Sequence, residues 1–168
     1  MRRLLFLLIL AGATQALAQT KTTEKLDADY DGMSLYFYKN TLRMLNQKED
    51  PAFDEMIKDI EKIRFVMVDR NEGRKFTNSD YAKLKSDYLK KESYEEIMTG
   101  RLDGRSLNVL VRESNGKVKG TVIMAGDSSN LYVLDILGKI ALEKAGALFK
   151  MIDENSDVAN KIRKAHID

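Results

Sequence analysis

The chain has 168 residues, of which 43% are hydrophobic, 32% are charged and one is a proline. A chain of this size buries roughly 70% of its unfolded surface, so it can form one self-sufficient core. The 28 Lys and Arg residues against 26 Asp and Glu residues give a net charge of +2, which argues against the strongly basic surface of a nucleic-acid binder. Cysteine is absent, and this excludes thiol nucleophiles, disulfides and cysteine-based metal centres.

Residues 1–18 have the three parts of a secretory signal peptide. Arg2 and Arg3 precede the apolar run 4–11, and Ala16-Leu17-Ala18 has small residues at the positions that a signal peptidase reads. The apolar run is shorter than the roughly 20 residues of a membrane anchor. We therefore expect cleavage between Ala18 and Gln19 and no membrane span in the mature chain. Loss of the two arginines leaves 26 residues of each sign, so neither nucleic acid nor anionic lipid is an expected partner.

Residues 19–31 are polar and show no periodicity, so we expect a flexible lead-in before the domain. The aromatic-rich segment 33–38 predicts a first strand with Leu35 and Phe37 on one face. Its other face carries Tyr36 and Tyr38.

The next segments alternate between helical and strand-like patterns. Residues 41–46 predict a short helix, and Asp50-Pro51 predicts a second, with an N-cap followed by proline at the first helical position. Apolar residues behind Pro51 recur at helical spacing as far as Ile63. The mostly apolar run 64–68 then predicts a central strand.

The second half of the sequence reads as one helix, several strands and a last helix. Ser79 is the expected cap of a helix with an apolar stripe. Strands are expected in four segments, residues 94–102, 107–112, 118–124 and 131–137. Asn115-Gly116 is the strongest short signal for a hairpin. The last helix is expected from Leu142, Ala145, Phe149 and Ile152.

This order predicts a single α+β domain over residues 32–153, followed by a polar C-terminal tail at 154–168. We expect a mostly antiparallel sheet of about five or six strands with helices packed on one face. The helix between the first two strands permits one parallel pair through a right-handed crossover.

The segment Asp27 to Gly32 resembles the opening of a calcium loop, in which Asp27, Asp29 and Asp31 would converge on a cation before the glycine turn. Such a loop ends with a bidentate glutamate at its twelfth position, and that position is Tyr38 here. The three aspartates are therefore only a weak calcium candidate, and a solvated acidic lead-in followed by an Asp-Gly turn into the first strand is the preferred explanation. No other metal site is expected.

The segment Gly126-Asp127-Ser128-Ser129 is the only one to suggest a serine nucleophile. Such a serine needs a base, and the single histidine, His166, lies three residues from the C-terminus. Turn chemistry between two strands explains the same residues. We therefore predict no catalytic residue and no cofactor.

The chain resembles a family of small exported proteins found mostly in Bacteroidetes, domain of unknown function 4252. The resemblance rests on the signal peptide and on apolar patterns and turns across nearly all of the mature chain. These are Asp29-Tyr30-Asp31-Gly32 leading into residues 33–36, residues 62–68, Tyr94-Glu95-Glu96-Ile97, residues 107–112, the Asn115-Gly116 hairpin and residues 131–138. The resemblance implies a periplasmic or secreted setting in a Gram-negative bacterium. It implies no activity, cofactor or site residue.

Two functions from different classes remain open. The first is a non-enzymatic binding or interaction module of the cell envelope, whose partner is an unknown envelope protein or ligand. Its expected contact surface is the sheet face away from the helices, where Tyr36 and Tyr38 would provide amphipathic contact area. The alternative is a periplasmic enzyme that uses carboxylates, lysine or an unrecognised cofactor, and a deep pocket of such groups would favour it. The oligomeric state is not predicted.

Overall fold

The computed structural model describes residues 20–46, 49–102 and 104–141, together with 143, 144, 146 and 148. The expected signal peptide, the expected tail and His166 lie outside these residues, as do Leu142, Ala145, Phe149 and Ile152. The strands, in chain order, are β1 (Met33–Tyr38), β2 (Ile60–Asp69), β3 (Glu95–Leu102), β4 (Arg105–Ser114), β5 (Lys117–Gly126) and β6 (Asn130–Gly138). The helices are α1 (Lys21–Tyr30), α2 (Lys39–Leu45), α3 (Pro51–Ile57) and α4 (Asn78–Lys91).

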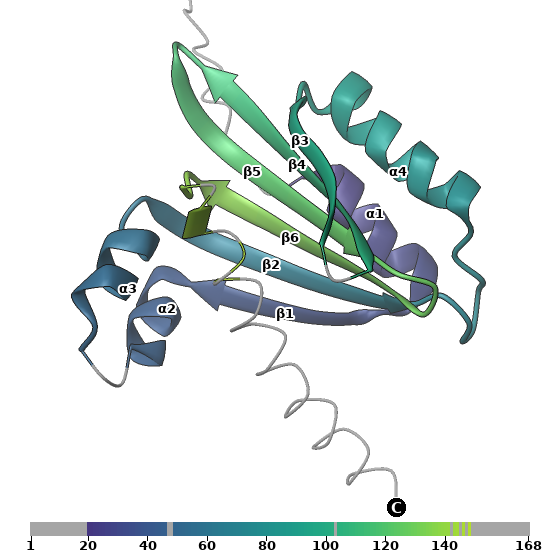
Figure 1. The fold of residues 1–168 in the computed structure, drawn as a ribbon, viewed down its shortest axis with the longest axis horizontal. Coiled ribbons are helices and arrows are strands. Elements are labelled where there is room, and N and C mark those ends of the chain that lie inside the picture. Colours follow the sequence, from purple (N-terminus) through teal and green to yellow (C-terminus); the bar gives the residue numbers. More distant parts are fainter. Residues whose placement is uncertain are drawn as a thin grey trace, which may run out of the picture.

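The strands form one six-stranded sheet in the order β1-β2-β6-β5-β4-β3, and every neighbouring pair is antiparallel. The predicted α+β domain with an antiparallel sheet is thus confirmed. The parallel pair that the sequence permitted is not formed, because β1 and β2 pair antiparallel. The short helices α2 and α3 turn the chain back at one end of the sheet (Figure 1), and they do not carry it across a face as a parallel crossover requires.

The predicted hairpin joins β4 to β5. Asn115 has φ 53° and Gly116 has φ 68°, so both central residues are left-handed, as a type I′ turn requires. Glycine takes this conformation without a Cβ clash, and asparagine is among the few other residues that tolerate it. The turn sets the register at its base, where Ser114 faces Lys117, and a shift between Arg112 and Glu113 then changes the register so that Val109 faces Ile123.

One helix was not predicted, and the bounds of the others differ from the predictions, α2 by one or two residues at each end. The expected flexible lead-in contains α1, whose buried residues are mostly threonines and therefore leave no apolar periodicity. Helix α3 begins at Pro51 behind the Asp50 cap as predicted but ends at Ile57, and Ile60 and Ile63 belong to β2. The cap of α4 is Thr77, which forms a reciprocal capping box with Asp80.

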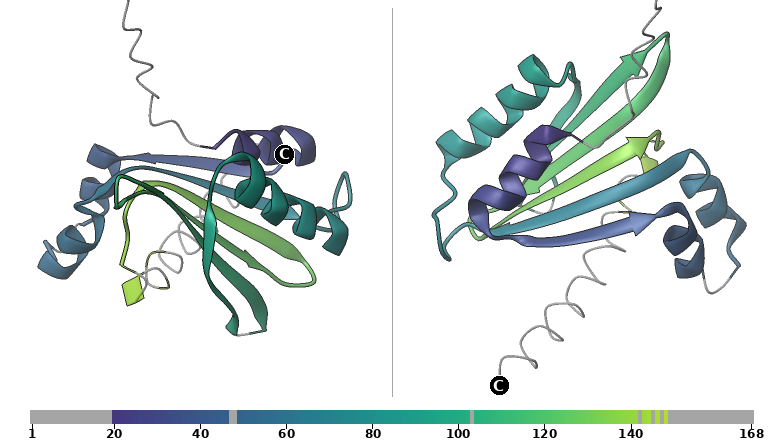
Figure 2. Two further views of the ribbon diagram at one scale, coloured as in Figure 1. Left: turned by 90° about the horizontal axis from the view of Figure 1, so that it is seen from above. Right: turned by 180° about the vertical axis from the view of Figure 1, so that it is seen from behind.

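Helices α1 and α4 lie side by side on one face of the sheet, as Figure 2 shows from behind. The apolar core between them and the sheet includes Leu26 of α1, Leu84 and Tyr88 of α4, and strand residues such as Val66 and Val133. The prediction that helices share one face holds for this pair. Helices α2 and α3 sit at the end of the sheet and contribute to the core of the other face.

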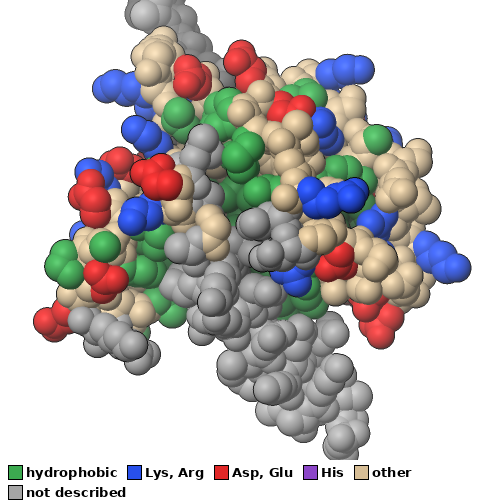
Figure 3. Space-filling model, viewed as in Figure 1, with side chains coloured by type: hydrophobic (Ala, Val, Ile, Leu, Met, Phe, Trp, Pro, Cys, Tyr) green, Lys and Arg blue, Asp and Glu red, His purple; other side chains and the backbone are tan. Residues whose placement is uncertain are grey.

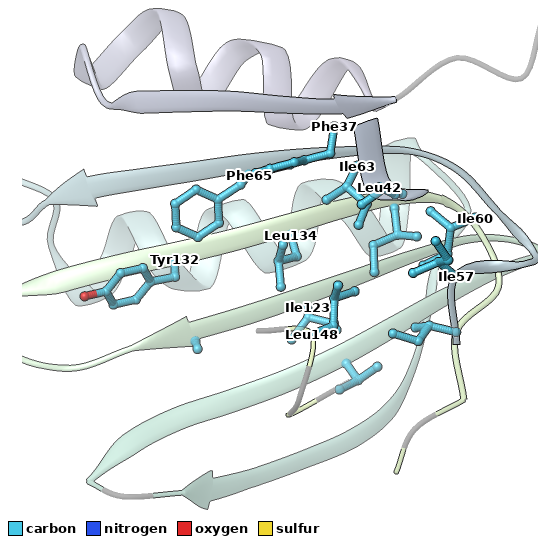
Figure 4. Packing of buried hydrophobic residues seen from close by; sticks show 14 residues of the cluster. Phe37, Leu42, Ile57, Ile60, Ile63, Phe65, Ile123, Tyr132, Leu134 and Leu148 are labelled. Atoms are coloured by element: carbon cyan, nitrogen blue, oxygen red, sulfur yellow. The ribbon is translucent and has the colours of Figure 1, made fainter. Parts of the chain in front are cut away.

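The core of the other face is almost entirely aliphatic and aromatic. Phe65, Ile123 and Leu134 lie at its centre, and Leu42 of α2 and Ile57 of α3 close its end (Figure 4). In the space-filling view, apolar side chains gather over the middle of this face and charged ones surround them (Figure 3). None of the helices that the structure describes is long and apolar enough to cross a membrane.

Candidate functional site

Tyr36 and Tyr38 lie on the outer strand β1 with 42% and 56% of their surface exposed. Alternation along β1 directs them away from Phe37, which is in the core of the opposite face. We expected them on the face away from the helices, and this placement is wrong. Ser34, on the same side of β1, donates a hydrogen bond to Asp27 of α1 at 2.6 Å, so the two tyrosines lie on the face that α1 covers.

A lysine of the neighbouring strand lies over both exposed rings. Lys62 faces Tyr38 across the β1–β2 ladder, and its Nζ is 5.0 Å from the Tyr36 ring centroid and 5.2 Å from that of Tyr38. Arg64 faces Tyr36 and stacks on it with its Cζ 5.1 Å from the centroid. These four residues form what we call the β1 edge cluster, two aromatic rings held in place by cation–π contacts.

The β1 edge cluster lies at an open edge of the sheet. Among the strands that the structure describes, β1 pairs with β2 alone, and the opposite edge is β3. The pairing of β1 with β2 runs without a shift over all six residues. An edge strand of this kind presents backbone donors and acceptors to solvent on its free side.

The three aspartates of the calcium candidate do not converge. Asp27 and Asp29 are two residues apart on α1, a spacing that points side chains in different directions. Asp27 accepts a hydrogen bond from Arg64, whereas Asp29 pairs with Lys25 at 2.9 Å. The hydrogen bond from Lys25 lowers the pKa of Asp29 below its ordinary value.

Asp31 is the C-cap of α1 and has the left-handed conformation, with φ 47°. A helix and its C-cap therefore occupy the place where a calcium loop would begin. Within residues 20–141, gaps excepted, and the four described beyond them, no three potential metal ligands gather.

The loop between β5 and β6 shows the predicted turn chemistry. Oδ1 of Asp127 accepts hydrogen bonds from the backbone of Ser129 at 2.7 Å and of Asn130 at 2.8 Å. Its other oxygen accepts one from Arg105 at 3.3 Å. The carboxylate thus shapes the turn in the manner of an Asx motif.

A buried polar network lies beneath α1 and was not predicted from the sequence. Asp135, in the middle of β6, is only 1% exposed. Its Oδ2 accepts hydrogen bonds from the backbone nitrogen of Thr20 at 2.9 Å and from the Thr20 hydroxyl at 3.0 Å. The Thr20 hydroxyl also lies 2.6 Å from that of Thr23, which in turn lies 2.7 Å from the hydroxyl of Tyr88 on α4. One chain of hydrogen bonds thus joins strand β6 to α1 and α4.

Burial dominates the electrostatics of this network. It raises the pKa of Asp135, although the hydrogen bonds from Thr20 and Thr23 act in the opposite direction. It also raises the pKa values of Tyr88 and Tyr94, with the negative charge of Asp135 as the next contribution. Two signals in the sequence point to the network. Asp135 is the one acidic residue in the otherwise apolar run 131–137, and three threonines precede or begin α1.

A second polar cluster joins α4 to the strands at the other edge. Asn108, buried on β4, donates hydrogen bonds to Glu96 and to Thr99, the latter at 3.0 Å, and accepts one from Tyr81 of α4. Lys85 of α4 donates to Glu96 at 2.8 Å. Burial, followed by the charge of Glu96, raises the pKa of Tyr81 to about 12. These contacts fix α4 in place and leave no free acid or base in the cluster.

The comparisons with known proteins identify a family without an assigned activity. The family model described as "Domain of unknown function (DUF4252)" matches residues 27–148. The chain belongs to this family, because the match covers well over half of it, from the second half of α1 to beyond β6. No curated protein matches the chain.

Proposed function

We propose that this DUF4252 protein is an exported, non-enzymatic binding module of the cell envelope of a Gram-negative bacterium. We further propose that it contacts its partner through β1, with Tyr36 and Tyr38 as the main contact residues. The export signal of residues 1–18 supports the location, with cleavage between Ala18 and Gln19. Mass spectrometry of protein recovered from the native envelope is the test. An N-terminus at Gln19 is expected, and an intact Met1 in a membrane fraction would contradict export and processing.

The observation that carries the binding proposal is the β1 edge cluster on an open sheet edge. Tyrosines are enriched at interfaces because each offers a large, rigid and amphipathic surface. Lys62 holds the Tyr36 and Tyr38 rings in place before a partner arrives, so less side-chain entropy is lost on binding.

The free edge of β1 defines the kind of partner. An extended polypeptide segment can add to such an edge as a further strand, in which main-chain hydrogen bonds give affinity and alternate side chains give specificity. The residues of an added strand that lie on the Tyr36 side would meet the two rings and Lys62. The proposed partner is therefore an envelope protein with an exposed extended segment that carries apolar or acidic side chains.

The enzyme alternative finds no support in the described residues. The carboxylate most shielded from water is that of Asp135, and hydrogen bonds from Thr20 enclose it beneath α1. The groove between α1 and α4 is lined by charged side chains that pair with one another, such as Lys25 with Asp29. Neither arrangement presents a free general acid or base to a substrate.

The binding proposal is tested by capture from envelope extract on the immobilised mature chain. The double variant Tyr36→Ala/Tyr38→Ala removes both rings, and Ile97→Ala is the matched control, because Ile97 is a comparably exposed apolar residue on the opposite edge strand. A hot-spot side chain is worth about 2 kcal/mol or more, hence over about tenfold in affinity. Specific partners should be lost from the double variant and retained by Ile97→Ala. Equal capture by the double variant would contradict the proposal, as would loss with Ile97→Ala alone.

A further inference from the structure

The free edge of β1 lacks the features by which proteins keep an exposed strand from pairing with other chains. Charged side chains, prolines and bulges protect most sheet edges. Strand β1, residues 33–38, contains no charged residue and no proline, and its register with β2 has no shift. The opposite edge strand, β3, carries Glu95, Glu96 and Arg101, and its register shifts between Glu96 and Met98. Of the two edges, β1 is the one suited to pairing.

No element that the structure describes runs along the free side of β1. Helix α2 follows beyond the Tyr38 end of the strand, and α1 lies over a face of the sheet, as Figure 2 (right) shows. Tyr36 and Tyr38 are both exposed. Among the described residues, an incoming strand therefore meets only the unpaired backbone groups of β1 and the side chains that flank them.

A second copy of the chain supplies a strand that matches β1. When two identical strands pair antiparallel about a two-fold axis normal to the sheet, residues that face each other have side chains on the same side. In the register centred on Tyr36, this residue faces its own copy, and Ser34 of each chain faces Tyr38 of the other. Both exposed tyrosines then lie inside the paired segment, whereas a register centred on Leu35 leaves Tyr38 outside it.

The contacts made in this register are favourable on both faces of the sheet. On the face away from α1, Leu35 of each copy meets Phe37 of the other. Phe37 belongs to the apolar core of that face and Leu35 packs against it, so the core continues across the two chains. On the face that α1 covers, the two Tyr36 rings meet at the axis, and aromatic side chains directly opposite each other stabilise an antiparallel pair.

The charged side chains nearest to this interface do not oppose the pairing. Arg64 is neutralised by Asp27, whose Oδ2 lies 2.7 Å from Nη2 of the arginine. Lys62 faces Tyr38 on the neighbouring strand. Two copies of Lys62 are therefore offset along the strands by the distance from Ser34 to Tyr38, about 13 Å. That distance exceeds the Debye length of about 8 Å at physiological ionic strength, so their repulsion is largely screened.

We propose that β1 pairs with β1 of a second copy about a two-fold axis at Tyr36, so that one continuous sheet runs through both chains. This inference rests on the proposed role of β1 as a binding edge, and it names a second copy of the chain as an occupant of that edge. The paired segment, residues 34–38, is short, and small interfaces of this kind are transient. The pair therefore forms at about micromolar concentration or above and exposes the edge again when it dissociates.

The geometry is tested by cross-linking. Because the chain contains no cysteine, a single introduced cysteine can form a disulfide only with the same residue of another chain. In Tyr36→Cys the two cysteines face each other at the axis, with Cβ atoms about 4.5–5.5 Å apart, close to the Cβ separation of about 3.5–4.5 Å in a disulfide. The matched control is Tyr38→Cys, which is on the same side and more exposed but lies about 13 Å from its own copy.

Under mild oxidation, Tyr36→Cys should form the disulfide-linked pair about tenfold faster than Tyr38→Cys, or more, because the longer distance cannot be bridged without movement of the backbone. Equal rates, or faster cross-linking of Tyr38→Cys, would overturn the two-fold pairing at Tyr36.

A second measurement is the mass of the purified mature chain by analytical ultracentrifugation, from about 1 μM to a few hundred μM. The mass should rise from that of one chain towards that of two. Tyr36→Glu and Tyr36→Lys each place like charges opposite each other, which destabilises the pair, so each variant alone should remain a single chain. An equimolar mixture places opposite charges at the axis and should recover the mass of a pair. A wild-type mass of one chain throughout would overturn the proposal, as would the same mass in each variant alone and in the mixture.

These measurements use purified chain, whereas the proposed function is tested by capture from envelope extract. A wild-type chain that stays single but captures partners through Tyr36 and Tyr38 would contradict the second copy and leave the proposed function intact. A chain that pairs as described but captures no partner would contradict the proposed function alone.

Discussion

Helices α1 and α4 cover the same face of the sheet but are attached to it by different chemistry. Helix α4 buries Leu84 and Tyr88, so its contact is mainly apolar. Helix α1 buries Thr22, Thr23 and Leu26, so two of its three buried side chains contact the rest of the protein through hydrogen bonds. Apolar contact depends on the area that is removed from water, whereas a buried hydrogen bond depends on the presence of its partner. The attachment of α1 should therefore be the more sensitive to single polar changes.

The largest loss of stability should come from substitution of Tyr88, which lies on α4 and contacts Thr23 of α1. Its ring is fully buried against Tyr94, and its hydroxyl bonds to Thr23 of α1. Tyr88→Ala should lower the free energy of unfolding by about 3–5 kcal/mol, measured by urea denaturation. Tyr88→Phe keeps the ring and should cost only about 1 kcal/mol. Equal losses in the two variants would show that the hydroxyl, and not the ring, dominates.

Thr23→Val tests whether α1 and α4 are attached to the sheet independently. It keeps the shape of the side chain and removes the hydroxyl that bonds to both Thr20 and Tyr88. We expect a loss of about 1–2 kcal/mol, with faster amide hydrogen exchange confined to α1. The matched change on the other helix is Leu84→Ala, with an expected loss of about 2–3 kcal/mol and faster exchange in α4. If Thr23→Val speeds amide exchange equally in both helices, α1 and α4 unfold as one unit, and the proposed difference between their attachments is wrong.

Asp135 should give the α1 attachment a pH dependence that α4 lacks. Burial raises the pKa of Asp135 in the folded state, so the folded chain binds this proton more tightly than the unfolded chain does. The resulting stabilisation is complete below the unfolded value and is lost as pH rises through the folded one. The free energy of unfolding of Asp135→Asn relative to that of the wild type, measured by urea denaturation, should therefore increase from pH 4 to pH 7. A difference that stays constant over this range would refute the expectation.

The smallest expected effect concerns a second hydrogen-bonded link between the two helices, besides that of Thr23 with Tyr88. Glu92, at the end of α4, accepts hydrogen bonds from the backbone and the hydroxyl of Thr22 at 2.9 Å and 3.1 Å. Glu92→Gln keeps an acceptor but removes a negative charge beside the N-terminus of α1, where it interacts favourably with the helix dipole. A loss of about 0.5–1 kcal/mol is expected at low salt, and it should shrink when salt is added. A loss that does not change with salt would assign the effect to hydrogen-bond geometry.

The same comparison explains which parts of the fold could be predicted from the sequence. The strands other than β2, the Asn115-Gly116 hairpin and the start of α3 depend on short patterns, and the structure has them close to where the patterns indicate. Strand β2 begins at Ile60, inside the segment whose apolar spacing predicted a helix. Helix α1 was missed because its buried face carries Thr22 and Thr23, whose hydroxyls bond to Glu92 and Tyr88 of a distant segment. Its cap, Thr20, bonds to Asp135, which lies 115 residues away along the chain. A contact of that range leaves no periodicity in either segment.

The β1 edge cluster shows the same limit. Alternation along β1 predicted that Tyr36 and Tyr38 share one side of the strand, and both are indeed exposed. The packing of α1 and α4 decides which side of the sheet the helices cover, and the sequence of β1 alone does not indicate that side. The tyrosines therefore lie on the helix side of the sheet and stay exposed there.

The two outer strands also differ in regularity, and this affects how copies of the protein can associate. Strand β1 pairs without interruption, whereas the register of β3 shifts between Glu96 and Met98, with Ile97 as the extra residue. Fibril growth through sheet edges requires two flat edges on every copy, and a bulge disrupts one of them. The bulge in β3 therefore leaves β1 as the one flat edge among the described strands, so edge-to-edge association of copies through β1 would stop at a pair of chains.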